Sequence, residues 1–202
     1  TIKYKWVFKK KRDRDGNVNR YKARLVARGY SQILGVDYEA TYAPTLGLIS
    51  LRILASTAAH RRWKMVQIDV VAAYLRAKLP DTEVLYMDAP DGMEIPAGHA
   101  LRLRKCIYGL KQSARYWNKD IHNTLVGLGY EPSQFDSCVY LKYEEEELVA
   151  TLGLYVDDIL CCGEDKDVDE TIAILKKVYD ITGGDEPDFV LGIAIDYDRE
   201  QG

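Results

Sequence analysis

Hydrophobic and polar positions along the chain follow two different patterns, and the first of them is typical of strands. Residues Tyr4–Lys10 and Val18–Ala27 are rich in β-branched and aromatic side chains, which favour extended structure. Between them, Asp15-Gly16-Asn17 supplies the residue types that tight turns require. We therefore predict a β-hairpin at the start of the chain.

A second hairpin is predicted in the second half of the chain. The stretches Val139–Tyr143 and Leu148–Tyr155 are rich in β-formers. The acidic run Glu144–Glu147 lies between them and fits a turn exposed to water.

The second pattern, apolar residues at helical spacing, predicts three helices. They cover Leu48–Arg62, Ser113–Leu128 and Val168–Tyr179. Gly129 fits the end of the second helix, and Asp167 fits the N-cap of the third. The second helix has one apolar stripe, formed by Ala114, Trp117, Ile121, Leu125 and Leu128.

The remaining segments are predicted to be strands and loops. Trp63–Val71 fits a strand, whereas residues 80–100 should be mostly loop with a short strand near Val84–Met87. The turn Gly183-Gly184 precedes a last strand at Phe189–Tyr197. Strands and helices mix without regular alternation, so the predicted fold class is α+β, with helices packed on one face of a mainly antiparallel sheet.

Length and composition fit an ordinary globular protein. The chain has 202 residues, of which 47% are hydrophobic and 29% are charged, enough for one large domain or two small lobes. No apolar run approaches the roughly 20 residues that cross a bilayer, so we expect no membrane partner. Because the chain begins with Thr1 rather than Met, we expect it to be a segment of a longer polypeptide.

Charge is distributed unevenly along the chain. Residues 1–30 contain eleven Lys or Arg and two Asp, whereas residues 136–202 contain five basic and nineteen acidic side chains. A basic N-terminal lobe could attract the phosphates of a nucleic acid. Charge alone leaves this interpretation and a pair of solvated charged faces equally open.

The four cysteines do not indicate a metal site. They form no C-x-x-C pair, and the three histidines show no zinc-ligand spacing. We predict that the cysteines are small apolar residues of the core.

Two adjacent acids interrupt an apolar stretch near the end of the chain. Leu152–Val156 and Ile159–Cys162 fit two buried strands, which places Asp157-Asp158 at the tight turn between them. Carboxylates held so close to a core repel each other unless a cation joins them. The local pattern leaves two alternatives, a metal site and a plain exposed turn, where Asp is common.

A third acid lies in an equally unusual place. Val66–Val71 fits the core of a strand, and Asp69 lies inside it, where a lone Asp is unfavourable unless it is paired or coordinated. Two apolar strands that each carry central carboxylates suggest a shared site. Oxygen ligands suit Mg²⁺, and two ions about 4 Å apart would bridge an attacking hydroxyl and a leaving oxygen.

The residues around these acids resemble a known family. Tyr155-Val156-Asp157-Asp158 resembles the catalytic motif of reverse transcriptases. Further segments are similar to those of one branch, the copia-like LTR retrotransposons, and follow the family's order over essentially the whole chain. These segments are Tyr21–Gln32, Asp37–Pro44, Gln67–Leu75, Leu103–Trp117 and Phe189–Ile193.

The resemblance implies a fold of fingers and palm. It places the first part of the fingers at 1–62, the first palm segment at 63–77 and the second part of the fingers at 78–108. The second palm segment, with the catalytic hairpin and the segment that grips the primer, would cover 109–202. A thumb and an RNase H domain are expected to be absent.

The implied activity is that of an RNA-directed DNA polymerase, which transfers a nucleotide from a dNTP to a primer 3′-hydroxyl with two Mg²⁺ ions, or with Mn²⁺. Asp69 and Asp157 would hold both metals, with help from the backbone of Val70. Asp158 would be a weaker or alternate ligand, because successive side chains of a strand diverge.

The resemblance also implies residues that contact the substrates. Tyr74 lies where an aromatic ring excludes a ribose 2′-hydroxyl, and the alternative is a core aromatic residue. Lys22 and Arg24 would clamp the triphosphate, a role for which Arg28 is also in reach. The nucleotide-binding set is Val70, Val71, Tyr74, Tyr108, Gly109, Lys22 and Arg24. The template and primer set is Lys111, Gln112, Arg115, Tyr155, Val156, Leu191 and Gly192.

The implied partners are RNA and DNA template–primer, a dNTP and the rest of the Pol polyprotein, whereas the oligomeric state stays open. The implied location is the cytoplasmic virus-like particle, with the nucleus at integration. One alternative is an inactive or domesticated nucleic-acid-binding relic of the same domain. Another is an unrelated α+β module that binds RNA through its basic hairpin. Metal-dependent primer extension distinguishes the polymerase from the relic. The unrelated module predicts nucleic-acid binding that Asp157→Asn leaves unaffected.

Overall fold

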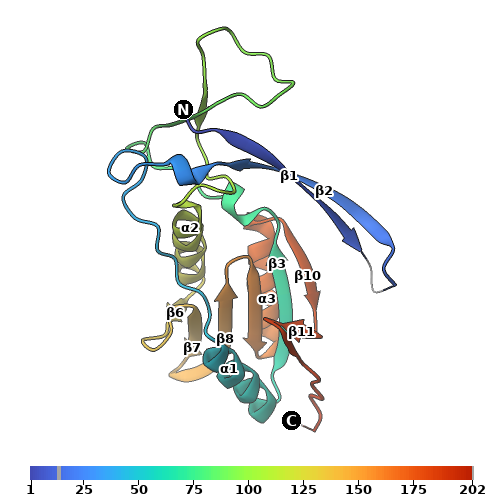
Figure 1. Cartoon of the computed structure of the whole chain (residues 1–202). Helices are drawn as coiled ribbons and strands as arrows, with labels where there is room; N and C mark the ends of the chain where they lie inside the picture. Colours follow the sequence, from blue (N-terminus) through green and yellow to red (C-terminus); the bar gives the residue numbers. More distant parts are fainter. Residues whose placement is uncertain (13–14, 202) are drawn as a thin grey trace. The chain divides into compact units, whose positions relative to one another are not determined.

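The chain folds into two compact units in a computed structural model that describes residues 1–12 and 15–201 (Figure 1). Unit 1 comprises Thr1–Ala43 and Tyr74–Trp117, and unit 2 comprises Pro44–Ala73 and Asn118–Gly202. The chain therefore changes unit after residues 43, 73 and 117. The predicted changes between fingers and palm come after residues 62, 77 and 108, and the assignment of these names stays a prediction.

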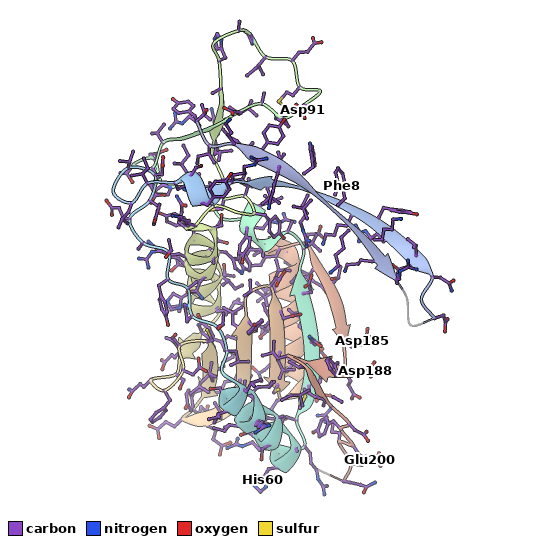
Figure 2. The ribbon with its side chains drawn as sticks, viewed as in Figure 1. Phe8, His60, Asp91, Asp185, Asp188 and Glu200 are labelled. Carbon is purple, nitrogen blue, oxygen red and sulfur yellow. The ribbon has the colours of Figure 1, made fainter. Side chains whose placement is uncertain are left out.

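Unit 1 begins with the predicted hairpin, which is confirmed. Strand β1 (Tyr4–Arg12) pairs antiparallel with β2 (Val18–Ala27), and Gly16 has a φ of 84° in the connection. The paired strands reach well beyond the buried residues, so most of their side chains are exposed. Phe8, which projects from β1 in Figure 2, is 75% exposed.

A second, shorter pair of strands completes the sheets of unit 1. β4 (Leu85–Met87) pairs antiparallel with β5 (Leu101–Leu103), and Ile2 forms a parallel bridge with Met87. The predicted short strand near Val84–Met87 is confirmed. β5 was not predicted. A 3₁₀ turn, η1 (Gly29–Ser31), follows β2.

Unit 2 is built around a six-stranded sheet with the order β10-β3-β9-β8-β7-β6, in which every pair of neighbours is antiparallel. The predicted antiparallel sheet is therefore confirmed. Its strands are β3 (Lys64–Val70), β6 (Tyr130–Pro132), β7 (Val139–Glu144), β8 (Glu147–Tyr155), β9 (Asp158–Gly163) and β10 (Ile181–Asp185).

The described residues form three α-helices, α1 (Leu48–Arg61), α2 (Ser113–Gly127) and α3 (Asp165–Val178). All three were predicted, but their packing on one face of the sheet was not correct. A Cβ on Gly153 would lie 2.7 Å from Leu54 of α1, so this face of β8 is covered by α1.

Helix α3 covers the opposite face. Lys142 of β7 donates a hydrogen bond to Asp167 of α3, and Lys142 pairs with Ala150 of β8. Ala150 is three residues from Gly153, so the two residues lie on opposite faces of β8. Figure 1 shows α1 in front of the sheet and α3 behind it. The sheet is therefore buried on both faces, which explains the nearly continuous apolar sequence of β8 and β9.

Three predicted boundaries near the C-terminus were wrong. Helix α3 begins at Asp165 rather than at Val168, so Asp167 lies inside the helix and is not its N-cap. The predicted turn at Gly183-Gly184 belongs to strand β10. The predicted strand Phe189–Tyr197 is instead a small hairpin of β11 (Phe189–Val190) and β12 (Ile193–Ala194).

The four cysteines are free and buried, which confirms their prediction as core residues. Cys106 lies in unit 1, and Cys138, Cys161 and Cys162 lie in unit 2. Burial raises the pKa of Cys106 to about 11 and that of Cys161 to about 12. In the part of the chain that is described, no helix is long and apolar enough to span a membrane.

Candidate active site

The first part of the site is a pair of acids on neighbouring strands of unit 2. In the register of β3 and β9, Asp69 lies directly opposite Asp158, so both side chains are on the same face of the sheet. β10 flanks β3 on its other side, where Thr182 is the partner of Asp69. A strand on each side of β3 fixes the backbone that carries Asp69.

The third acid lies in the tight turn that joins β8 to β9. Tyr155 pairs with Asp158, which leaves Val156 and Asp157 as the turn residues. The predicted turn is therefore one residue out of place, because Asp158 already belongs to β9. Both turn acids still lie at the same end of the hairpin, as the sequence predicted.

This turn has a strained backbone. Val156 has a φ of 56°, a conformation that is unfavourable for a β-branched residue. Such strain costs of order 1–3 kcal/mol and is maintained only when the surrounding structure fixes it. The neighbouring strands provide this constraint, because the Val70 N–H donates a hydrogen bond to the Asp157 carbonyl at 2.9 Å.

The Val70 hydrogen bond also bears on the predicted nucleotide contacts. The Val71 N–H donates to the Asp180 carbonyl at 2.8 Å, so both backbone N–H groups are already used within unit 2. A triphosphate would have to displace these carbonyls to reach them. The predicted contact of Val70 and Val71 with the nucleotide stays a prediction.

The electrostatics of the three acids reflect their proximity. Burial raises the pKa of Asp158, and the negative charges of Asp69 and Asp157 raise it further. A hydrogen bond from Gln67 Nε2 to Asp158 Oδ1, 3.4 Å long, acts in the opposite direction. Carboxylates that destabilise each other's charged form are a suitable environment for a cation.

The donor set fits a hard divalent cation. It consists of the carboxylate oxygens of two opposed strand residues, Asp69 and Asp158, and of Asp157 in the adjoining turn. Mg²⁺ prefers oxygen ligands, with waters and substrate phosphates completing its shell. Among residues 1–12 and 15–201, no group of three or more His, Cys, Asp or Glu is already placed to hold an ion.

Unit 1 contains an aromatic and cationic cluster of its own. The rings of Tyr74 and Tyr108 meet edge to face with centroids 5.0 Å apart. The Arg24 guanidinium lies over the Tyr108 ring at 5.0 Å from its centroid. Three of the predicted nucleotide-binding residues therefore lie together in this unit, and Tyr74 is packed by a ring rather than isolated.

Two glycines allow the chain to come close at this cluster. The Ala27 N–H donates to the Tyr108 carbonyl at 2.8 Å, which joins the end of β2 to the loop before α2. Gly109 has a φ of 91°, and a Cβ there would lie 2.1 Å from the Ala27 oxygen. A Cβ on Gly29 would lie 2.0 Å from the Gly109 oxygen. Neither position can hold a side chain without moving the backbone.

The predicted template residues Lys111 and Gln112 belong to a buried polar network. Gln112 is fully buried, and its Nε2 donates to the Asp37 carbonyl at 2.8 Å and to Glu83 at 2.9 Å. Its Oε1 accepts a hydrogen bond from Gln32 Nε2 at 3.0 Å. A buried side chain with these partners positions the loop, so a contact with the template would require the network to open.

Lys111 is held by the same network and is only partly buried. Its backbone N–H donates to Gln32 Oε1 at 2.8 Å, and its Nζ donates to the Tyr38 hydroxyl at 3.1 Å. Its ammonium also lies over the Tyr38 ring. The side chain is therefore oriented, and its contact with the template stays a prediction.

The remaining predicted residues occupy separate positions within their units. Lys22 is half-buried on β2, and Arg115 is exposed near the start of α2. Tyr155 is 38% exposed at the end of β8. Leu191 and Gly192 form the two-residue turn between β11 and β12, both with positive φ as a type I′ turn requires.

The sequence did not identify several residues that support the site. Gln67 precedes Asp69 by two residues, so it shares its face of β3 and reaches Asp158. Gln32 and Glu83 hold Gln112. The signal for Gln67 was its polar side chain inside an apolar strand, whereas Gln32 and Glu83 lie in loops and show no periodic pattern.

Comparison with known families gives one match that covers nearly the whole chain. The family model described as reverse transcriptase (RNA-dependent DNA polymerase) matches residues 1–201. The matched range includes Asp69, Asp157 and Asp158 and covers both units.

Similar proteins come from plants and yeast. A retrovirus-related Pol polyprotein from transposon RE1 of Arabidopsis thaliana is 37% identical over 192 residues, which are 94% of this chain and 13% of that protein. A second, from transposon TNT 1-94 of Nicotiana tabacum, is 36% identical over 204 residues, 98% of this chain and 15% of that protein. The transposon Ty1-DR1 Gag-Pol polyprotein of Saccharomyces cerevisiae is 30% identical over 205 residues, 97% of this chain and 11% of that protein. The chain therefore spans a small part of these relatives.

Proposed function

The chain belongs to the reverse transcriptase family, and we propose on this basis that it is the polymerase segment of a retrotransposon Pol polyprotein. It would act as a nucleotidyltransferase that joins deoxynucleotides to a primer 3′-hydroxyl on an RNA or DNA template. The observation that carries this proposal is the pairing of Asp69 with Asp158 across β3 and β9, beside Asp157 in the adjoining turn. An inactive relic is not favoured, because all three acids are present.

The acids would bind two Mg²⁺ ions, with Mn²⁺ as an alternative. Asp69 and Asp157 would be the principal ligands, and Asp158 would be the weaker one because Gln67 already donates to it. When bound, the ions would supply an activated primer hydroxyl and neutralise the charge of the triphosphate and of the leaving pyrophosphate. The backbone of Val70 remains a predicted further ligand.

The protein's own contribution would be mostly to position groups. The strained turn at Val156 holds Asp157 and Asp158 on a rigid sheet, and correct placement of reacting groups supplies a large part of catalysis. Arg24, over the Tyr108 ring, would neutralise phosphate charge together with Lys22. Tyr74, supported edge-on by Tyr108, would exclude a ribose 2′-hydroxyl.

Template and primer would be held largely through their backbones. Lys111, Arg115 and the basic hairpin of β1 and β2 would contact phosphates, so binding should weaken as salt concentration rises. The primer would contact Tyr155, Val156 and the Leu191-Gly192 turn. We also propose that the segment works with the rest of a Pol polyprotein in cytoplasmic virus-like particles, and in the nucleus at integration.

The test is Mg²⁺-dependent incorporation of a single dNTP on a DNA primer annealed to an RNA template. The variant Asp157→Asn should abolish incorporation, because it removes a metal ligand. A matched control is Asp185→Asn on the exposed edge strand β10, labelled in Figure 2, which should retain activity. Incorporation that persists in a folded Asp157→Asn protein, or that needs no divalent ion, would contradict the proposal.

A further inference from the structure

A row of four side chains that carry oxygen atoms crosses one face of the sheet in unit 2. Tyr155 of β8 pairs with Asp158 of β9, which in turn pairs with Asp69 of β3. Asp69 then pairs with Thr182 of the edge strand β10. Directly opposed residues of antiparallel strands point to the same face. The row therefore places Thr182 beside Asp69, on the side away from Asp158.

The backbone on both sides of Thr182 is held against β3. The Val71 N–H donates to the Asp180 carbonyl at 2.8 Å, two residues before Thr182. A Cβ on the next residue, Gly183, would lie 2.8 Å from the Gln67 carbonyl, so the two strands approach closely there. Figure 1 shows β10 beside β3 at the edge of the sheet. These contacts hold Thr182 in register with β3.

The Thr182 hydroxyl is available to donate a hydrogen bond. Its side chain is exposed, and it has no hydrogen-bond partner among the residues that the structure describes. The Cβ atoms of directly opposed residues are about 4.5–5.5 Å apart, which is within the reach of a Thr hydroxyl and an Asp carboxylate. Thr182 can therefore serve Asp69 without giving up a bond that it already makes.

The acid opposite Asp69 already has a donor of this kind. Gln67 Nε2, on β3, donates to Asp158 Oδ1 at 3.4 Å. A carboxylate that holds an ion is commonly oriented by a hydrogen bond to it from a neighbouring group. Each acid of the opposed pair thus has a neutral donor side chain on the adjacent strand, Gln67 for Asp158 and Thr182 for Asp69.

We propose that Thr182 is a positioning residue, whose hydroxyl donates a hydrogen bond to Asp69 and holds this carboxylate in the orientation that binds a divalent ion. The inference rests on the proposed function, because it concerns the metal site of the proposed polymerase. Thr182 acts only through Asp69 and touches neither the reacting atoms nor the substrates. Loss of such a hydrogen bond typically lowers metal affinity by about 10–100-fold.

The test compares metal binding in two variants of this residue. Thr182→Val replaces the hydroxyl by a methyl group and keeps the β-branched shape that strands favour, whereas Thr182→Ser keeps the hydroxyl. The dissociation constant for Mn²⁺, measured without nucleic acid from the electron paramagnetic resonance signal of the free ion, should rise about tenfold or more in Thr182→Val. It should stay close to the natural value in Thr182→Ser.

Activity and stability give two further readouts. In single-nucleotide incorporation, the Mg²⁺ concentration that gives half of the maximal rate should rise in Thr182→Val by the same factor as the Mn²⁺ dissociation constant. Thermal melts without divalent ions should be alike for the natural protein and both variants. If Thr182→Val melts early, the pair Thr182→Ala and Thr182→Ser replaces it, because these two side chains differ only in the hydroxyl.

The outcomes separate this inference from the proposed function. A folded Thr182→Val protein that binds Mn²⁺ as tightly as the natural protein overturns the inference, and so does an equal loss of affinity in the Val and Ser variants. If Asp157→Asn removes Mn²⁺ binding while Thr182→Val keeps it, the metal site stands and only the role of Thr182 fails. A natural protein that binds no Mn²⁺ overturns the metal site and this inference together.

Discussion

Asp69 and Asp158 face each other as direct partners on strands β3 and β9, with Asp157 in the turn that begins β9. Like charges at directly opposed positions of an antiparallel pair are destabilising. The sheet nevertheless holds them, because its strands are buried on both faces by apolar residues. The site therefore stores repulsion that a bound cation would relieve.

Replacing Asp158 by Asn should stabilise the metal-free protein, because it removes one of the repelling charges. We expect a gain of about 0.5–2 kcal/mol in the free energy of unfolding at neutral pH. Thermal melts with and without Mg²⁺ measure it, and the stabilisation by Mg²⁺ should be smaller in the variant than in the natural protein. A variant that melts lower than the natural protein without metal would contradict this account.

The pH dependence of that gain follows from the raised pKa of Asp158. In the range between its unfolded and its folded pKa, the folded state binds more protons, so the free energy of unfolding falls as pH rises. The advantage of Asp158→Asn should therefore be absent below the unfolded value of 3.8 and complete above the folded pKa. Melts of both proteins across this range, without divalent ions, measure the difference.

Replacing Val156 by Gly tests whether the strained backbone of this turn contributes to catalysis. Gly adopts the φ of 56° without steric cost, so we expect stability to change by less than about 1 kcal/mol. The turn acids would be held less firmly, and loss of positioning on the scale of 1 Å can reduce activity about a hundredfold. Single-nucleotide incorporation and a urea melt on the same sample compare the two effects. Equal activity in the Gly variant would show that the strain has no catalytic role.

Replacing Gly109 by Ala should destabilise unit 1 by about 2–5 kcal/mol, because it combines a positive φ with a collision against the Ala27 carbonyl. Gly98 is the matched control. It has a φ of 79° and nothing within 4 Å of its Cβ position, so Gly98→Ala should cost only about 1 kcal/mol. Denaturant melts measure both. If both variants lose similar amounts of stability, the positive φ and not the collision with Ala27 explains the loss at Gly109.

Because Lys142 and Asp167 form a buried ion pair, we expect the stability effects of replacing them to be strongly coupled. Asp167 is 1% exposed and Lys142 is 14% exposed, with Nζ and Oδ1 2.8 Å apart. Lys142→Met should cost about 3–5 kcal/mol, because it leaves a buried carboxylate without its main partner. The double variant Lys142→Met/Asp167→Leu should recover most of the loss. A double-mutant cycle by thermal melts tests this, and additive losses would contradict it.

Tyr74 predicts selectivity for deoxynucleotides. Tyr74→Val removes the ring that packs against Tyr108 and should reduce the preference for dNTP over rNTP by about 10–200-fold. The measurement is kcat/KM for incorporation of a dNTP and of the matching rNTP. Tyr108→Phe is the control, because it keeps the aromatic contact and should keep the preference. If Tyr74→Val keeps the preference for dNTP over rNTP, Tyr74 is a core aromatic residue and does not select the sugar.

Local chemistry was sufficient to predict several elements from the sequence. The first hairpin has a strong turn signal at Asp15-Gly16-Asn17, and Asp69 and Asp157 were conspicuous because acids are rare inside apolar strands. The helices followed from apolar residues at helical spacing. Each of these signals depends on residues that are close in the sequence.

The errors arose where distant contacts decide the structure. Gly183 was predicted as a turn, yet it pairs in β10, where a Cβ would lie 2.8 Å from the Gln67 carbonyl. Glycine is therefore used there for close approach of two strands rather than for chain reversal. Asp167 was predicted as an N-cap, but its carboxylate pairs with Lys142 on another element. Neither partner is visible in the local sequence.

Alkylation of the buried cysteines can report partial opening of the protein. A thiol reacts as thiolate, and burial raises the pKa of Cys106 in unit 1 and of Cys161 in unit 2, so neither should be alkylated in the closed state. Labelling would occur only when the surrounding structure opens. Because the two residues belong to different units, mass spectrometry of the alkylated peptides can time the opening of each unit independently, without any added probe.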